Sequence, residues 1–502
     1  MPDMTPNQQE ALSLLDCIDG LEKYISGVSH PCSELRDRLQ SILAKGNEFP
    51  LEDEWELDEI SMCLRSLWLL RAHQTSGNFL KSPPHEQAKF LPSGKRLQYD
   101  YERSFRPKPL ENRARRFSSV PKDWQSEHLL FSSGMGALSI VSQICCGRLN
   151  GPRPSRPVTL DMFGGYFETW RLLDFIHDAS LEIRHIESNE DICERIEGAK
   201  TDAMLIEPVA YDWDMTVFDH PAFIDAWMKA GEDRPRVLIF DTSLTGHRFN
   251  IEKVLTDLTD KPPWLIVGVR SGLKLDQQGL ELSNVGIVDL YAPKNSSPAS
   301  LHDLAKKLGA ARSVMGTGLT LDQLSVLEAP WFLNRQQFEG YGDSVFENNQ
   351  TLAQSVNLVG GIFSKISHPS LEKHCQLDWA VAPFVVFHLA EDSPGNHGFL
   401  IAVLVHEVTR RKLVFALGSS FGFRGHRFEV IQPMIHLTPN PEQSGLLKVA
   451  MGFRKGASLD GVIQLINEIA AIKNFTALRS TYPKIKAFVK DSAGVYAERP
   501  PR

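Results

Sequence analysis

The sequence lacks the features that mark membrane-spanning, secreted and nucleic-acid-binding proteins. None of its apolar stretches reaches membrane-spanning length without charges. Acidic and polar residues stand near the N-terminus, where a signal peptide needs an apolar core. Lys and Arg number 54 against 62 Asp and Glu, and the resulting net charge of -8 argues against a nucleic-acid binder. We therefore expect a cytoplasmic protein with neither a membrane nor a nucleic-acid partner.

Cysteine is also scarce. Seven cysteines are scattered along the 502 residues without the spacing of a metal site. This pattern indicates a reducing, cytoplasmic setting and predicts no metal centre.

What is present is the composition of an ordinary globular protein, with 42% hydrophobic and 23% charged residues. A chain of this length is sufficient for two or three domains. Apolar side chains recur at helical spacing within residues 12–21, 35–43 and 60–70. We therefore predict a helical N-terminal extension over residues 1–95, which ends in breaks of regular structure around residues 81–95.

The middle of the chain alternates short apolar runs with longer helical ones. The candidate strands are residues 158–160, 203–206, 237–240 and 265–269. Such alternation is typical of parallel strands joined by crossover helices. We predict a large three-layer α/β/α domain over residues 96–310.

The last part of the chain has a different pattern. Strand-like alternation occurs at residues 380–389 and 448–453, and residues 459–472 have the spacing of an amphipathic helix. This predicts a smaller α+β domain over residues 311–502.

Two residues at predicted strand ends suggest a specific chemistry. Lys274 follows the apolar run 265–269, and Asp241 follows the run 237–240. A desolvated lysine amine loses its proton more easily and suits a Schiff base. An aspartate at a neighbouring strand end suits the pyridinium nitrogen of pyridoxal phosphate. The pair is therefore a candidate pyridoxal-phosphate site.

Three further segments offer suitable groups at strand ends. Residues 132–137 carry two glycines at the start of a helical stretch, where free backbone amides bind phosphate. Phe163 precedes two glycines, an arrangement that lets a ring lie flat on a planar cofactor. Glu207 and Tyr211 follow a third strand, and ligands of such folds collect outside the carboxyl ends of the strands.

The order and spacing of these motifs resemble the Cys/Met-metabolism family of pyridoxal-phosphate enzymes, the cystathionine γ-synthase and methionine γ-lyase group of fold type I. The resemblance covers roughly residues 97–290, with a fainter continuation to about 470. The matching segments are residues 101–107 (Y-x-R-x-x-N-P in the family), Gly134-Met135 (G-M), 163–165 (Y-G-G), 207–212 (E-S-P-x-N-P), 241–243 (D-N-T) and 271–274 (S-A-T-K).

The resemblance implies a role for each matched residue. It implies that Lys274 holds the cofactor as a Schiff base and moves protons, and that Asp241 pairs with the pyridine nitrogen. The cofactor-binding residues that it implies are Tyr101, Arg103, Gly134, Met135, Phe163, Glu207, Asp241, Ser243, Ser271 and Lys274. It also implies that Tyr101 and Arg103 reach a partner subunit's cofactor phosphate, so we expect a homodimer or homotetramer with shared active sites.

The chain also departs from the family pattern. Phe163 replaces the stacking Tyr, and Tyr211 replaces the Asn at the cofactor's phenolate oxygen, where its hydroxyl could substitute. Lys448 stands where an Arg clamps the substrate carboxylate, and Arg427, Arg424 or Arg454 could supply the missing fork.

These observations predict a pyridoxal-phosphate-dependent lyase or transferase that acts on an amino acid by γ-elimination or γ-replacement. Lys274, Asp241 and Tyr211 are the expected catalytic residues. The departures suggest a specialised role, such as biosynthesis of an unusual amino acid of the propargylglycine type. The string at residues 418–422 also resembles the G-S-x-F-G of class I aminotransferases, so an aminotransferase remains open. A non-catalytic relic of the fold is a third alternative.

Overall fold

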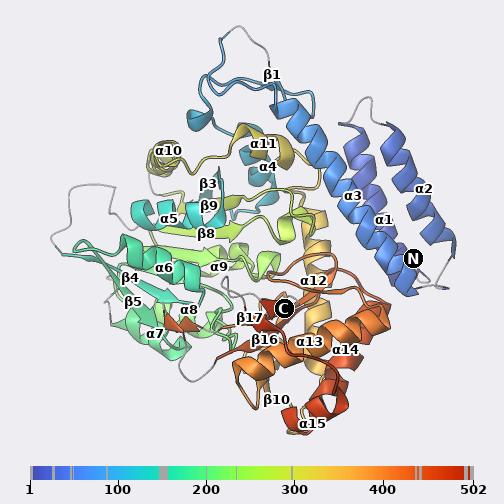
Figure 1. Cartoon of the computed structure of the whole chain (residues 1–502). Helices are drawn as coiled ribbons and strands as arrows, with labels where there is room; N and C mark the ends of the chain where they lie inside the picture. The colour runs from blue at the N-terminus through green and yellow to red at the C-terminus, as the bar shows by residue number, and fades with distance from the viewer. Residues whose placement is uncertain are drawn as a thin grey trace.

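The computed structural model describes residues 4–24, 29–45, 48, 50–85, 89–145, 156–198, 201–232, 234–295, 298–432, 434–435, 438–439, 444–490 and 496–497. Their elements fall into an N-terminal group of helices, a seven-stranded sheet with helices on both faces, and a five-stranded sheet with its own helices (Figure 1).

The N-terminal group has three helices, α1 (Pro6–Glu22), α2 (Ser29–Lys45) and α3 (Pro50–Ser76), which lie side by side along one flank of the molecule (Figure 1). Helix α1 begins at a capping box, in which Thr5 and Gln8 each accept a hydrogen bond from the other's backbone N–H. The three predicted helical stretches are confirmed. After Ser76 the chain instead forms a short hairpin of β1 (Lys89–Phe90) and β2 (Arg96–Leu97) around the predicted break.

The seven-stranded sheet has the order β3-β9-β8-β7-β6-β4-β5. Its strands are β3 (Trp124–Phe131), β4 (Val158–Phe163), β5 (Leu181–Ile186), β6 (Ala203–Ile206), β7 (Val237–Asp241), β8 (Leu265–Ser271) and β9 (Gly286–Pro293). The four predicted strands are β4, β6, β7 and β8, and they pair in parallel with their neighbours as predicted, except that β9 runs antiparallel to β8. The sequence pattern missed β3, β5 and β9.

Two layers of helices bury this sheet. The side that packs around Leu160 and Met162 is covered by α5 (Gly134–Cys145), α6 (Phe167–Ile176) and α10 (Pro298–Val314). The side that packs around Phe163 and Phe240 is covered by α7 (Asn189–Glu197), α8 (His220–Lys229) and α9 (Ile251–Asp257). The predicted three-layer α/β/α architecture is therefore confirmed.

The five-stranded sheet has the order β10-β11-β16-β13-β12. Its strands are β10 (Phe363–Ser367), β11 (Val385–Leu389), β12 (Phe415–Leu417), β13 (His426–Ile431) and β16 (Leu446–Ala450). One face packs on α12 (Arg335–Ser355), α13 (Pro394–Arg411), α14 (Ala457–Ala470) and α15 (Phe475–Thr481). The other face carries Val386, Leu446 and Ala450 into the core of the large sheet. Side chains alternate along a strand, so this alternation aims Arg427, Glu429 and Lys448 toward the large sheet.

The remaining described elements connect these groups. They are η1 (Glu102–Ser104), α4 (Lys108–Phe117), η2 (Gly246–Arg248), η3 (Leu275–Gln277), α11 (Leu321–Leu327), η4 (Pro369–Leu371), β14 (Met434–Ile435), β15 (Thr438–Pro439), β17 (Val489–Lys490) and β18 (Tyr496–Ala497). Cys17, Cys32, Cys63, Cys193 and Cys375 are free. Within the described ranges, no helix combines the length and apolar character needed to cross a membrane.

Candidate active site

The predicted site residues follow the carboxyl ends of parallel strands and therefore meet at one edge of the large sheet. In the register of β7 and β8, Asp241 is opposite Val269, two residues before β8 ends at Ser271. Glu207 directly follows β6, and Phe163 is the last residue of β4. This edge is where ligands bind in open α/β sheets.

Lys274 lies in a largely buried position just beyond β8. Its Nζ donates a hydrogen bond of 2.5 Å to Ser420 Oγ and lies 5.3 Å from the centre of the Phe421 ring. Burial lowers the pKa of Lys274, against the opposing charge of Glu281, while Lys448 and Arg427 add to the lowering. A lowered pKa increases the fraction of neutral, nucleophilic amine near neutral pH.

Asp241 accepts a hydrogen bond from the Ser243 backbone, and Ser243 in turn accepts one from the Ser271 backbone. The Ser243 N–H donates to Asp241 Oδ1 at 3.0 Å, and the Ser271 N–H donates to Ser243 Oγ at 2.9 Å. Burial raises the pKa of Asp241, and the hydrogen bonds from Ser243 oppose that effect. A buried carboxylate of this kind is suited to pairing with a cation, since a positive charge beside it would keep it ionised.

A compact cradle lies beside Ser271 at the start of α5. A Cβ added at Gly134 would lie 3.2 Å from Ser271 Cβ, so a side chain there would push the two segments apart by a few tenths of an ångström. Met135 follows in the first turn of α5, and Thr317 approaches Gly136. Thr317 Oγ1 is buried without a hydrogen-bond partner in the described part of the chain. Sequence reasoning missed Thr317 because it lies about 180 residues from the glycine motif.

The Glu207 carboxylate connects the loop that follows β4 to the loop that follows β6. Its carboxylate accepts hydrogen bonds from the backbone N–H groups of Gly165 (3.0 Å), Tyr166 (3.3 Å) and Tyr211 (2.9 Å). Burial raises the pKa of Glu207 to about 8, although these N–H groups oppose the shift. Its observed contacts are thus with backbone amides, and they position Tyr166 and Tyr211.

Phe163 lies in the core instead of at the open edge. Strand β4 runs three residues beyond the predicted end at residue 160, and its alternation turns Phe163 toward the α8–α9 face. Its ring packs 6.3 Å from that of Phe218, and only 2% of the residue is exposed. The Tyr166 ring, by contrast, lies 5.5 Å from the Tyr211 ring, and the charge of Asp241 is one of the groups that raise the pKa of Tyr166. Tyr166 is therefore better placed than Phe163 to cover a planar cofactor.

Tyr211 and Lys448 form a buried cluster with Glu429, a residue that sequence reasoning missed. Glu429 lies opposite Lys448 in the register of β13 and β16, and their side chains form an ion pair. Burial lowers the pKa of Lys448, but Tyr211 and Glu429 outweigh burial and raise it overall. Lys448 therefore stays protonated at neutral pH, and it already has a carboxylate partner.

The three arginines proposed for the substrate carboxylate have different surroundings. Arg427 is partly exposed, stacks 3.3 Å above the Phe423 ring and lies 3.9 Å from Glu281 Oε2. Arg454 is fully buried and donates to Glu10 on α1 at 2.8 and 3.1 Å, and Arg424 lies beside the same carboxylate at 3.6 Å. Arg454 and Arg424 thus face Glu10 on the N-terminal helices and are buried away from the open sheet edge. Only Arg427 keeps accessible donors.

Tyr101 and Arg103 lie on the surface of this chain. Tyr101 is 45% exposed, and the Arg103 guanidinium lies 5.4 Å from the centre of its ring. Within the described ranges, neither residue contacts Lys274 or Asp241 of the same chain. Their predicted role toward a partner subunit therefore remains a proposal.

Comparisons with known proteins identify the fold. No protein-family model matches this chain, and no curated protein matches it in sequence. The apo form of a methionine γ-lyase from Micromonospora echinospora superposes with a TM-score of 0.52 and 15% identity, covering 80% of this chain and 99% of that one. A cystathionine γ-synthase from Xanthomonas oryzae pv. oryzae, in complex with aminoacrylate and cysteine, gives 0.53 and 15%, covering 83% and 99%. Serine palmitoyltransferase from Sphingomonas wittichii gives 0.50 and 13%, covering 83% and 84%.

The chain therefore has the architecture of fold type I pyridoxal-phosphate enzymes, as predicted. The predicted resemblance to the γ-synthase and γ-lyase group holds at the level of the fold. Because a palmitoyltransferase superposes almost as well, the fold leaves the reaction open, and the reaction has to be argued from the site residues.

Proposed function

We propose that this protein is a pyridoxal-phosphate-dependent enzyme that acts on an amino acid by γ-elimination or γ-replacement. The observation that carries the proposal is the placement of Lys274, a largely buried amine with a lowered pKa, at the same sheet edge as the buried carboxylate of Asp241. Methionine γ-lyase and cystathionine γ-synthase share this fold, and the choice of their reaction class is part of the proposal.

The residues at this edge fit the cofactor chemically. The cradle of Gly134, Ser271 and Thr317 offers helix N-terminal amides, a hydroxyl and an orphaned hydroxyl, which suit a phosphate. Asp241 offers a carboxylate for a pyridinium nitrogen. When bound, pyridoxal phosphate supplies an electron sink for the charge that develops at the amino acid's α-carbon.

The protein's own groups would then direct the protons. Lys274 Nζ would remove the proton from the α-carbon and return one further along the side chain, since burial lowers its pKa and favours the neutral amine. Asp241 would hold a proton on the ring nitrogen. Ser420 accepts a hydrogen bond from Lys274 and would orient the amine between these positions.

The test of this function is a panel of amino acids with different γ-substituents, incubated with cofactor-loaded protein and followed by mass spectrometry. We expect loss or exchange of the γ-substituent. Conversion of the bound cofactor to its amine form by amino acids alone would instead show an aminotransferase. Absence of both, together with no cofactor absorbance band, would show a non-catalytic relic.

We further propose a specialised product such as an unusual amino acid of the propargylglycine type, which the same panel tests with a chlorinated allylglycine.

We predict that Tyr166, and not Phe163, acts at the cofactor. The Tyr166 hydroxyl donates to Glu168 at 2.6 Å, and burial followed by Glu168 raises its pKa, so the phenol stays protonated. To donate to a leaving group, the hydroxyl would turn its one proton away from Glu168. Tyr166→Phe should keep cofactor binding but lower turnover by about 10²-fold. Phe163→Leu should keep cofactor binding and turnover, and it should lower the free energy of unfolding by about 1 kcal/mol. Absorbance titration, turnover and urea unfolding test this; loss of cofactor binding in a folded Phe163→Leu would restore the original assignment.

We also propose that Arg427 binds the substrate carboxylate, because Lys448 is already paired with Glu429. Arg427→Gln should raise KM about 10²-fold with a smaller change in kcat, through loss of a forked, charge-assisted contact. The double variant Lys448→Met/Glu429→Gln removes the buried pair without leaving a lone charge and should raise KM less. Arg335→Gln, at an exposed ion pair, is the control. A larger KM effect in the double variant would assign the carboxylate to Lys448.

We propose that the active sites are shared within a homodimer or homotetramer. The exposed positions of Tyr101 and Arg103 are compatible with contact to a partner subunit. Mixing inactive Arg103→Ala and Lys274→Ala chains, with subunit exchange allowed, should restore roughly a quarter of the sites, because each mixed dimer contains one complete site. If exchange is demonstrated by mass and no activity returns, Arg103 acts within its own chain or not at all.

A further inference from the structure

The N-terminal helices contact the segment that directly follows Lys274. Arg65 on α3 donates from Nε to the Leu280 carbonyl at 2.8 Å and from Nη2 to the Glu281 carbonyl at 3.1 Å. Leu280 and Leu282 are buried in the same apolar core as the three N-terminal helices. The chain leaving Lys274 is therefore held by α3.

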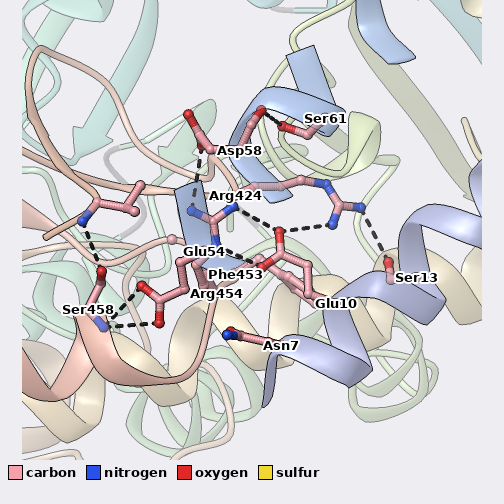
Figure 2. A network of polar contacts seen from close by, with 12 residues as sticks. Asn7, Glu10, Ser13, Glu54, Asp58, Ser61, Arg424, Phe453, Arg454 and Ser458 are labelled. Atoms are coloured by element: carbon pink, nitrogen blue, oxygen red, sulfur yellow. Dashed lines mark hydrogen bonds and ion pairs between the residues drawn. The ribbon is translucent and has the colours of Figure 1, made fainter. Parts of the chain in front are cut away.

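The same helices contact a second segment through a buried charge network (Figure 2). Glu10 on α1 is 1% exposed and accepts from Arg454 at 2.8 and 3.1 Å. Its carboxylate also lies 3.6 Å from Arg424, which donates to Ser13 at 3.3 Å. Arg424 is 2% exposed, so Glu10 is shared by two guanidinium groups that have little access to water. Asp58 supplies a second carboxylate, 3.6 Å from Arg454.

Arg424 belongs to the loop that contacts the Lys274 side chain. Ser420 in this loop accepts the hydrogen bond from Lys274 Nζ, and a Cβ added at Gly422 would lie 3.5 Å from Lys274 Cβ. Ser420 and Gly422 both have positive φ, 75° and 77°. For Ser420 this conformation is costly and needs support from its surroundings.

The support comes from the residues that the Glu10 network fixes. The Arg454 N–H donates to the Arg424 carbonyl at 3.0 Å, and the Tyr341 hydroxyl donates to the Gly422 carbonyl at 2.9 Å. Tyr341 stacks on Phe453 at 4.9 Å, next to Arg454 in the chain. A continuous set of contacts therefore leads from α1 to the Ser420 loop.

We propose that Glu10 and Arg65 are positioning residues for the candidate active site, through which the N-terminal helices hold the Ser420 loop and the segment after Lys274. The N-terminal helices then contribute to the function of the site by keeping these two segments in place. The expected effect on the bound cofactor rests on the proposed function of Lys274. The expected effect on the two segments does not depend on the cofactor.

The test compares Glu10→Gln with Glu22→Gln, an exposed carboxylate on the same helix that pairs with Arg36. In protein without added cofactor, hydrogen–deuterium exchange at residues 421–424 should rise about tenfold in Glu10→Gln, with the seven-stranded sheet unchanged. In cofactor-loaded protein, the circular dichroism of the cofactor band should fall by about half, because that signal reports a fixed ring orientation. Glu10→Asp, which keeps the charge, should recover most of both signals.

Arg65→Gln provides a second route if Glu10→Gln fails to fold, since it leaves no lone buried charge. It should raise exchange at residues 279–282 in the same way. Unchanged exchange and an unchanged cofactor band in folded Glu10→Gln or Arg65→Gln would overturn the proposal. If the wild-type protein binds no cofactor, the proposed function fails, and the exchange measurement alone still decides the positioning role.

Discussion

Replacing Lys274 with alanine is expected to abolish covalent cofactor binding and to lower turnover at least about 10³-fold. Lys274 combines burial with a lowered pKa, so its neutral amine can attack the cofactor's aldehyde and later remove a proton. Borohydride reduction of the cofactor-loaded wild-type protein, followed by peptide mapping, should place the pyridoxyl label on Lys274. Lys274→Arg keeps the charge and should also lose the label.

The ion pair of exposed Lys253 with half-buried Asp257 supplies matched controls within the same domain. Lys253→Ala should retain the label on Lys274 and the wild-type turnover. A label on any other lysine in the wild-type protein would refute the assignment of Lys274, whatever the activity of the variants.

Asp241→Asn is expected to bind the cofactor but to slow exchange of the substrate α-proton by about 10²-fold or more. The neutral amide cannot hold a proton on the ring nitrogen, so the charge at the α-carbon is no longer drained. The geometry should survive, because the Ser243 N–H can still donate to the side-chain oxygen of asparagine. Absorbance titration measures binding, and proton NMR in deuterated water measures exchange.

Asp257→Asn, at the control ion pair, should leave both measurements unchanged. Near-normal exchange in fully loaded Asp241→Asn would exclude the ring-nitrogen role. Loss of cofactor binding together with loss of exchange would show that Asp241 anchors the cofactor as well as tuning it.

The parts of the site that could be predicted from sequence lie directly beside strands in the chain. Lys274 and Asp241 each follow an apolar run, and β7 and β8 pair in the order that the run pattern suggested. Gly134 opens α5 where two glycines and an apolar stretch coincide. In these cases the local pattern carries both the element and the functional group, so position along the chain determines position at the sheet edge.

The sequence analysis misplaced the end of a strand, and one residue more or less in a strand reverses the direction of the next side chain. The strand around residue 160 was predicted three residues too short, and with the longer β4 the Phe163 ring enters the core while Tyr166 remains at the edge. The sequence pattern encodes the ends of strands only weakly. An error there has a large effect, because each added residue reverses the face to which the next side chain points.

The sequence by itself determined the three-layer class of the fold, the parallel strand pattern and the strand-end residues Lys274, Asp241 and Glu207. Only the tertiary structure decided that Glu429 neutralises Lys448, that Thr317 approaches the α5 glycines, and that Arg454 pairs with Glu10 across 444 positions of sequence. Local propensity and periodicity act over one element, whereas these contacts depend on how separate elements dock and on strand register. The charge balance of the site is therefore a property of the docked elements, which no local pattern specifies.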